Sequence, residues 1–124
     1  MQVGKKLFKN LIKMEKRLGK ISSIRFGHSG YQDVQIGISF TLSGKGWGVN
    51  DFKGYWDAEL IEHNDYCKWT ENDRDKSYAE IIRYLSKLLK DAKKDTVDEL
   101  KGVPIEVTFE GNILKSWRIL TEVL

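Results

Sequence analysis

Residues 33–42 alternate strictly between apolar and polar side chains, and this alternation constrains the fold more than any other feature of the chain. The apolar set is Val34, Ile36, Ile38, Phe40 and Leu42. Successive side chains of a β-strand point to opposite faces, so the run predicts a strand with one buried and one solvated face. One-sided strands are typical of antiparallel sheets. The feature therefore favours a sheet that is covered on one face only.

Four further segments carry strand signals, namely alternation or β-branched and aromatic residues bounded by turn residues. They are residues 21–26, 54–61, 103–110 and 113–123. A short Gly-containing link joins the first of them to the alternating run, which predicts a hairpin. Gly111-Asn112 predicts the turn of a second hairpin at the end of the chain. Pro104 indicates an edge strand or a strand end there.

Two amphipathic helices are expected, over residues 4–18 and 76–92, because apolar residues recur there at helical spacing. Asp73 or Asp75 can cap the second helix. The sequence thus predicts one α+β domain over residues 1–124: an antiparallel sheet of about five strands in the order α-β-β-β-α-β-β, with two helices packed on one face. Its parts are a basic amphipathic helix (1–19), strands with a glycine and aromatic loop (20–61), an acidic loop and helix (62–101) and a hairpin (102–124).

Charge is segregated along the chain, although the net charge is only +3. Residues 1–30 carry eight basic side chains against Glu15 alone, and we expect a basic patch there. Its members are Lys5, Lys6, Lys9, Lys13, Lys16 and Arg17. Residues 57–75 carry seven acids against two basic residues, which predicts an acidic patch. Its members are Asp57, Glu59, Glu62, Asp65, Glu71, Asp73 and Asp75. Either patch can attract a partner of opposite charge, and the basic one can meet nucleic acid.

Signals of catalysis are thin. His63 and Cys67 with the acids around them invite a metal or nucleophile interpretation, but the whole chain holds only three Cys and His residues. A structural zinc site needs about four ligands, and nothing marks an orienting group or oxyanion hole for a Cys-His hydrolase. The sequence predicts no catalytic residue, no metal site and no cofactor. A lone cysteine and the lack of a long apolar run or signal peptide predict a cytoplasmic protein without membrane contact.

A glycine and aromatic segment follows the alternating run. The candidate ligand loop in it comprises Lys45, Gly46, Trp47, Gly48, Tyr55 and Trp56. The Gly-x-Gly-x-Gly spacing is not a dinucleotide fingerprint, because no helix follows it. The glycines either permit a tight structural corner or form a cradle for a flat or anionic ligand on which the aromatic rings stack. Both interpretations stay open at this point.

The segments LKGVPIEVTFEGN (residues 100–112) and LKSWRIL (114–120), with the features that precede them from residue 33, resemble a group of small proteins encoded by bacteriophages and prophages. The resemblance covers roughly residues 33–124 and carries no catalytic residues. It implies a non-catalytic inhibitor of a bacterial defence system, anti-CRISPR-like, which binds a host effector protein or complex in the host cytoplasm. One alternative is an oligomeric sponge for a cyclic nucleotide signal. Another is a phage accessory protein that binds single-stranded nucleic acid, in which a sheet with aromatic side chains holds the strand.

Overall fold

The computed structural model describes residues 14–57 and 69–124, which form a mixed helix and sheet structure. The strands are β1 (Met14–Ser29), β2 (Gln35–Gly44), β3 (Trp47–Trp56), β4 (Pro104–Glu110) and β5 (Ile113–Ile119). The described part of the chain holds one long helix, α2 (Glu71–Ala92). Short 3-10 turns are η1 (Tyr31–Asp33), η2 (Val97–Leu100) and η3 (Thr121–Val123).

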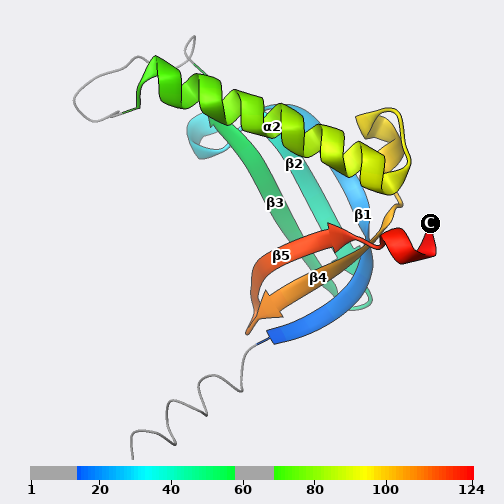
Figure 1. The fold of residues 1–124 in the computed structure, drawn as a ribbon. Helices are drawn as coiled ribbons and strands as arrows, with labels where there is room; N and C mark the ends of the chain where they lie inside the picture. The colour runs from blue at the N-terminus through cyan, green and yellow to red at the C-terminus, as the bar shows by residue number, and fades with distance from the viewer. Residues whose placement is uncertain (1–13, 58–68) are drawn as a thin grey trace, which may run out of the picture.

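The five strands form one antiparallel sheet in the order β3-β2-β1-β4-β5, with α2 lying across its concave side (Figure 1). The long strand β1 joins the two halves: residues 14–20 pair with β4, and residues 20–29 pair with β2. A bulge between Ile21 and Ser23 interrupts the second pairing. Bulges bend a strand and increase its twist. The sheet therefore curls, and its two edge strands, β3 and β5, approach each other.

Two glycines let the strands approach closely where β1 passes from one half of the sheet to the other. A Cβ atom on Gly19 would overlap the carbonyl oxygen of Ser43 and lie 2.7 Å from the Trp47 ring. A Cβ atom on Gly44 would overlap the same indole ring. Trp47 thus packs on two positions that have no side chain, and its ring meets Phe109 edge-on at 5.5 Å. The glycine and aromatic segment is a structural corner at this point.

Apolar side chains from the concave face and from α2 form the core. They include Ile21, Ile38, Phe40, Leu42, Leu85, Leu88, Ala92, Ile105, Val107, Phe109 and Ile119. Across the opening between the edge strands, Trp117 of β5 donates a hydrogen bond from Nε1 to Asp51 of β3 over 2.7 Å. Tyr84 of α2 lies beside this contact, and burial together with the Asp51 charge raises the pKa of its hydroxyl. Side chains therefore link the edge strands.

Helix α2 begins five residues before its predicted start. Its N-cap is Thr70, whose side chain accepts a hydrogen bond from the Asp73 amide, while the Asp73 carboxylate accepts one from the Thr70 amide. This reciprocal pair is a capping box. The prediction that Asp73 or Asp75 is the cap is therefore wrong, although Asp73 takes part in the box. The predicted end at Ala92 is confirmed, and Lys93 follows it in the left-handed conformation.

The structure corrects two further predictions and confirms three. The predicted helix over residues 4–18 is wrong for residues 14–18, which belong to β1, and the rest of it lies outside the described residues. The predicted strand over 54–61 instead runs over 47–56, and residues 58–61 lie outside the described part. The strand at 33–42 and the terminal hairpin are confirmed with shifted bounds. Pro104 takes the first position of an interior strand, so the strand-end interpretation holds.

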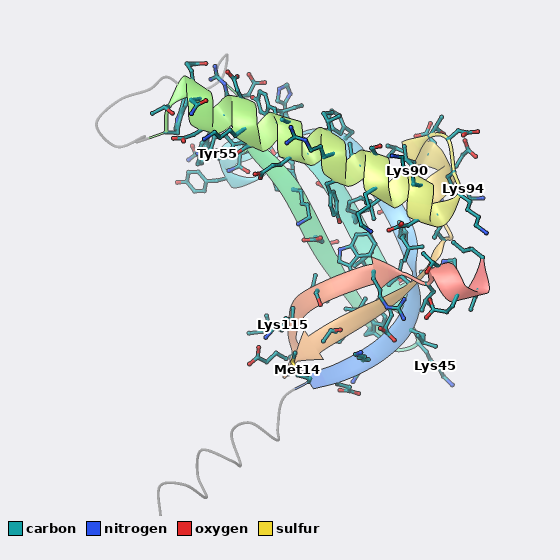
Figure 2. The ribbon with its side chains drawn as sticks, in the orientation of Figure 1. Met14, Lys45, Tyr55, Lys90, Lys94 and Lys115 are labelled. Carbon is teal, nitrogen blue, oxygen red and sulfur yellow. The ribbon has the colours of Figure 1, made fainter. Side chains whose placement is uncertain are left out.

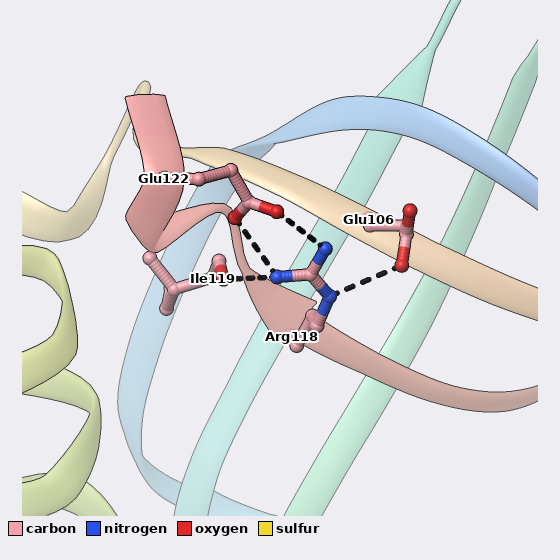
Figure 3. Close-up of polar contacts among 4 residues, drawn as sticks. All are labelled: Glu106, Arg118, Ile119 and Glu122. Carbon is pink, nitrogen blue, oxygen red and sulfur yellow. Dashed lines mark hydrogen bonds and ion pairs between the residues drawn. The ribbon is translucent and has the colours of Figure 1, made fainter. Parts of the chain in front are cut away.

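An exposed ion-pair cluster attaches the end of the chain to the sheet (Figure 3). The Arg118 guanidinium of β5 donates to Glu122 of η3 at 2.8 and 2.9 Å and to Glu106 of β4 at 3.1 Å. It also donates to the Ile119 carbonyl oxygen at 3.4 Å. The hydrogen bonds from Arg118 lower the pKa of Glu122 from 4.5 to about 2. The ionised carboxylate of Glu122 is therefore favoured in the folded chain.

This lowered pKa predicts an acid-dependent loss of stability. A group whose pKa falls on folding stabilises the fold above its unfolded value, and the contribution disappears as pH falls through the folded value. We expect the stability advantage of the wild type over Glu122→Gln to shrink between pH 4.5 and about 2. Urea denaturation across this window measures it, and Arg118→Ala should remove the same pH dependence. A difference between wild type and Glu122→Gln that stays constant with pH would contradict the assignment.

Candidate nucleic-acid interface

The face of β1, β2 and β3 that points away from α2, here called the outer face, carries no acidic side chain. The alternation that buries Ile38, Phe40 and Leu42 turns their neighbours outward, and strand register aligns them across the three strands. The outer-face residues are Ser23, Arg25, Gly27, Ser29, Gln35, Gly37, Ser39, Thr41, Ser43, Gly48, Asn50, Phe52, Gly54 and Trp56. In a chain with 31% charged residues, a polar face without a carboxylate suits an anionic ligand.

The register arranges these residues in rows that cross the strands. One row is Arg25, Ser39 and Phe52; a second is Ser29, Gln35 and Trp56. Between them lies the row Gly27, Gly37 and Gly54. The outer face thus presents a guanidinium and two aromatic rings, and a row of three glycines lies between them. These are the group types that contact phosphates and stack on bases.

Two of these side chains lie close to glycines of the outer face. A Cβ atom on Gly54 would overlap the Phe52 ring, so this ring lies directly over Gly54. A Cβ atom on Gly27 would lie 3.5 Å from the Arg25 guanidinium, which also donates to the His28 carbonyl oxygen over 2.7 Å. Arg25 is exposed and Phe52 is half-buried. The Arg25 guanidinium is therefore held along the sheet, and the Phe52 ring borders a cleft of about 400 Å³ whose other wall includes Glu80 and Tyr84 of α2.

Further basic side chains border the outer face. Lys16 and Lys20 are exposed and point to the same side of β1, since Lys20 lies opposite Ser43 in the register. Lys45 lies at the β2–β3 turn (Figure 2). Arg17 follows Lys16 on a strand and so points to the opposite, concave side. The two described members of the predicted basic patch, Lys16 and Arg17, therefore lie on opposite faces of the sheet. Its other members, Lys5, Lys6, Lys9 and Lys13, lie outside the described residues.

The candidate ligand loop is not one site in the structure. Gly46, Trp47 and Gly48 line a cleft of about 390 Å³. Its other walls are Arg17, Val49, Phe109, Gly111 and Asn112. Tyr55 and Trp56 lie at the far end of β3, as the positions of Lys45 and Tyr55 in Figure 2 show. Gly46 adopts a φ of 78° in the turn, which explains the glycine there.

Part of the acidic patch gathers near the start of α2. The pKa of Tyr78 is raised first by burial and then by the charge of Asp57, with smaller contributions from Glu71 and Asp75. Asp57 also pairs with His28 at 2.8 Å, and Glu71 pairs with Arg74. Glu59, Glu62 and Asp65 lie outside the described residues, as do His63 and Cys67.

Within residues 14–57 and 69–124, no three His, Cys, Asp or Glu side chains are grouped so that they could hold a metal ion. No helix in the same residues is long and apolar enough to cross a membrane. Comparison with protein-family models, curated proteins and solved structures finds no match to the chain.

Sequence reasoning missed Arg25 and Phe52 as candidate site residues. The available signal was the polar side of residues 35–42, namely Gln35, Gly37, Ser39 and Thr41, which contains no charge. A strand that merely faces water commonly carries charged residues on its solvated side. Their absence could have marked this side as a binding face.

Proposed function

We propose that this protein binds single-stranded nucleic acid on its outer face. The observation that carries the proposal is the composition of that face: Arg25, Phe52 and Trp56 lie there with no carboxylate among them. Aromatic rings stack on unpaired bases whatever the sequence, and basic residues at the margin follow the phosphates. The target is a single strand because the bases of a duplex are already stacked and paired.

The arrangement of the strands also supports the proposal, through a general likeness to a fold that binds oligonucleotides. OB-folds are five-stranded, partly open Greek-key barrels that bind oligonucleotides or oligosaccharides on the face of their second and third strands. Here five antiparallel strands form a curled sheet, α2 lies between β3 and β4 in the chain, and the outer face lies largely on β2 and β3. Such likeness of architecture does not determine a function, so the proposal depends on the side chains.

Salt titration tests the proposal. Four basic residues on or beside the outer face, Lys16, Lys20, Arg25 and Lys45, predict that log K falls with log salt with a slope of about −2.8, at roughly −0.7 per neutralised phosphate. Fluorescence anisotropy with a labelled oligothymidine of about 15 nucleotides, close to the upper range for one such module, measures the affinity. A duplex of the same length should bind more weakly.

A matched pair of variants separates this face from general charge attraction. Lys20→Gln with Lys45→Gln should weaken binding and reduce the steepness of the salt slope by about 1.4. Lys90→Gln with Lys94→Gln removes the same charge at the carboxyl end of α2 (Figure 2). This second double variant should leave the affinity and the salt slope unchanged. Equal effects of the two double variants, or no binding at low salt, would refute the proposed interface.

A second candidate is the non-catalytic inhibitor of a bacterial defence effector that the phage resemblance implies. The clustering of Asp57, Glu71 and Asp75 around Tyr78 supports an acidic contact surface for a basic partner. Charge complementarity of this kind speeds association and sets register. This candidate would replace the first if the protein bound no oligonucleotide and its partner binding failed on reversal of Glu71 and Asp75.

A further inference from the structure

We propose that the bound strand crosses β1, β2 and β3 roughly at right angles along the row Arg25–Ser39–Phe52. In this arrangement a phosphate lies at the Arg25 guanidinium and a base stacks on the Phe52 ring. The inference rests on the proposed function and assigns a path and two contact residues within that site.

The placement of Arg25 supports the phosphate contact. Its guanidinium lies against Gly27 and is tied to the His28 carbonyl oxygen, as described above, which fixes a long side chain that would otherwise lose much rotamer freedom on binding. This is the one hydrogen bond of the Arg25 side chain within residues 14–57 and 69–124, so the other N–H groups of the guanidinium stay available. A planar guanidinium can donate two parallel hydrogen bonds to the oxygens of one phosphate.

Phe52 provides the stacking surface in the same row. The tip of its ring lies over Gly54 of its own strand. The ring also borders a cleft of about 400 Å³ that Glu80 and Tyr84 of α2 line on the other side. Glycine in a strand interior often marks a place where a ligand or another backbone approaches closely. The sheet thus supports this ring from below, as a stacking platform requires.

The spacing of the row fits neighbouring nucleotides. The backbone positions of Arg25 and Phe52 are separated by two interstrand steps of roughly 4.8 Å, or about 10 Å. Their planar groups lie near Gly27 and Gly54, the two positions that flank Gly37. An alternative path along β3 would instead use Phe52 and Trp56, which are four residues or about 13 Å apart on one strand. The two paths differ in which side chain acts together with Phe52.

Variants of the two contact residues have different expected signatures. Arg25→Gln should weaken oligothymidine binding and reduce the steepness of the salt slope by about 0.7, because one phosphate contact is lost. Phe52→Leu should weaken binding about tenfold at unchanged slope, since it removes stacking and no charge. Trp56→Leu should leave the affinity nearly unchanged, because Trp56 lies two rows away from the crossing path. A loss of affinity in Trp56→Leu without one in Arg25→Gln would refute the crossing path.

Gly27→Val tests the placement of Arg25 without removing any charge or ring. The three atoms nearest to a Cβ at Gly27 all belong to the Arg25 guanidinium, and the larger valine side chain should displace this group. We expect the variant to keep its melting temperature and to weaken binding several-fold. Gly48→Val is the matched control: it lies on the same face, and a Cβ there meets only the Leu42 carbonyl oxygen at 3.9 Å. If Gly27→Val unfolds the chain, Arg25→Gln carries this test, because the Cβ of Gly27→Ala would only make ordinary contact with the guanidinium at 3.5 Å. Unchanged affinity in a folded Gly27 variant would refute the role of Arg25.

The outcomes distinguish this inference from the proposed function. If the wild type binds no oligothymidine at low salt, the function itself fails. If the wild type binds with the expected salt slope while Arg25→Gln and Phe52→Leu bind equally well, only the crossing path fails. Circular dichroism melts of each variant establish that the compared proteins are folded.

Discussion

We expect the Gly19→Ala variant to lose about 3 kcal/mol of unfolding free energy, because an extra methyl group has no room at this position. The added Cβ would overlap the Ser43 carbonyl oxygen and press on the Trp47 ring. Both neighbours are fixed: the first belongs to the backbone of β2, and the second packs against Gly44 and Phe109. Urea denaturation of the wild type and the variant measures the loss.

Gly48→Ala provides the control for this prediction. It makes the same chemical change two residues from the β2–β3 turn, where no atom other than the Leu42 carbonyl oxygen lies within 4 Å. We expect a neutral effect or a gain of about 0.5 kcal/mol, since alanine restricts the unfolded chain more than glycine does. If the two variants were equally stable, the close approach of β1, β2 and Trp47 would be wrong.

The start of β1 shows why the sequence predicted a helix where the structure has a strand. Leu7, Leu11, Met14 and Leu18 recur at helical spacing, which outweighed any alternation. Within the strand, the exposed positions Met14 and Leu18 point outward, whereas Arg17 lines the cleft on the concave side. In an ordinary half-buried strand the apolar side chains face the core, whereas here Met14 and Leu18 face outward. The conformation of these residues depends on pairing with β4, which lies far along the chain. A local sequence pattern therefore could not predict it.

The elements with a strong local signal were predictable. The alternation in β2 and β4, the Gly111-Asn112 turn and the apolar stripe of α2 each depend on neighbouring residues only. The candidate site was less accessible, because Arg25 and Phe52 meet in one row only through the register of three strands. The start of α2 was missed for a smaller reason: Thr70 and Asp73 form a capping box within a polar stretch that looks like a loop.

Trp117→Ala should cost about 4 kcal/mol, because this side chain packs against the core and also links the two edge strands. Its ring meets Phe40 edge-on at 5.1 Å, and its Nε1 donates the hydrogen bond to Asp51 across the opening of the sheet. Trp117→Phe keeps an aromatic ring against Phe40 and removes only the donor, so we expect a smaller loss of about 1.5 kcal/mol.

A double-mutant cycle between Trp117→Phe and Asp51→Ala isolates the bond that links β3 and β5. If the hydrogen bond holds these strands together, the second substitution should cost little once the first is present, with a coupling of about 1 kcal/mol. Full additivity would mean that packing of α2 alone keeps the edge strands close. The shape of the outer face depends on the curl of β1, β2 and β3. Measuring oligonucleotide affinity for the same variants therefore shows whether binding changes when the Trp117–Asp51 hydrogen bond is removed.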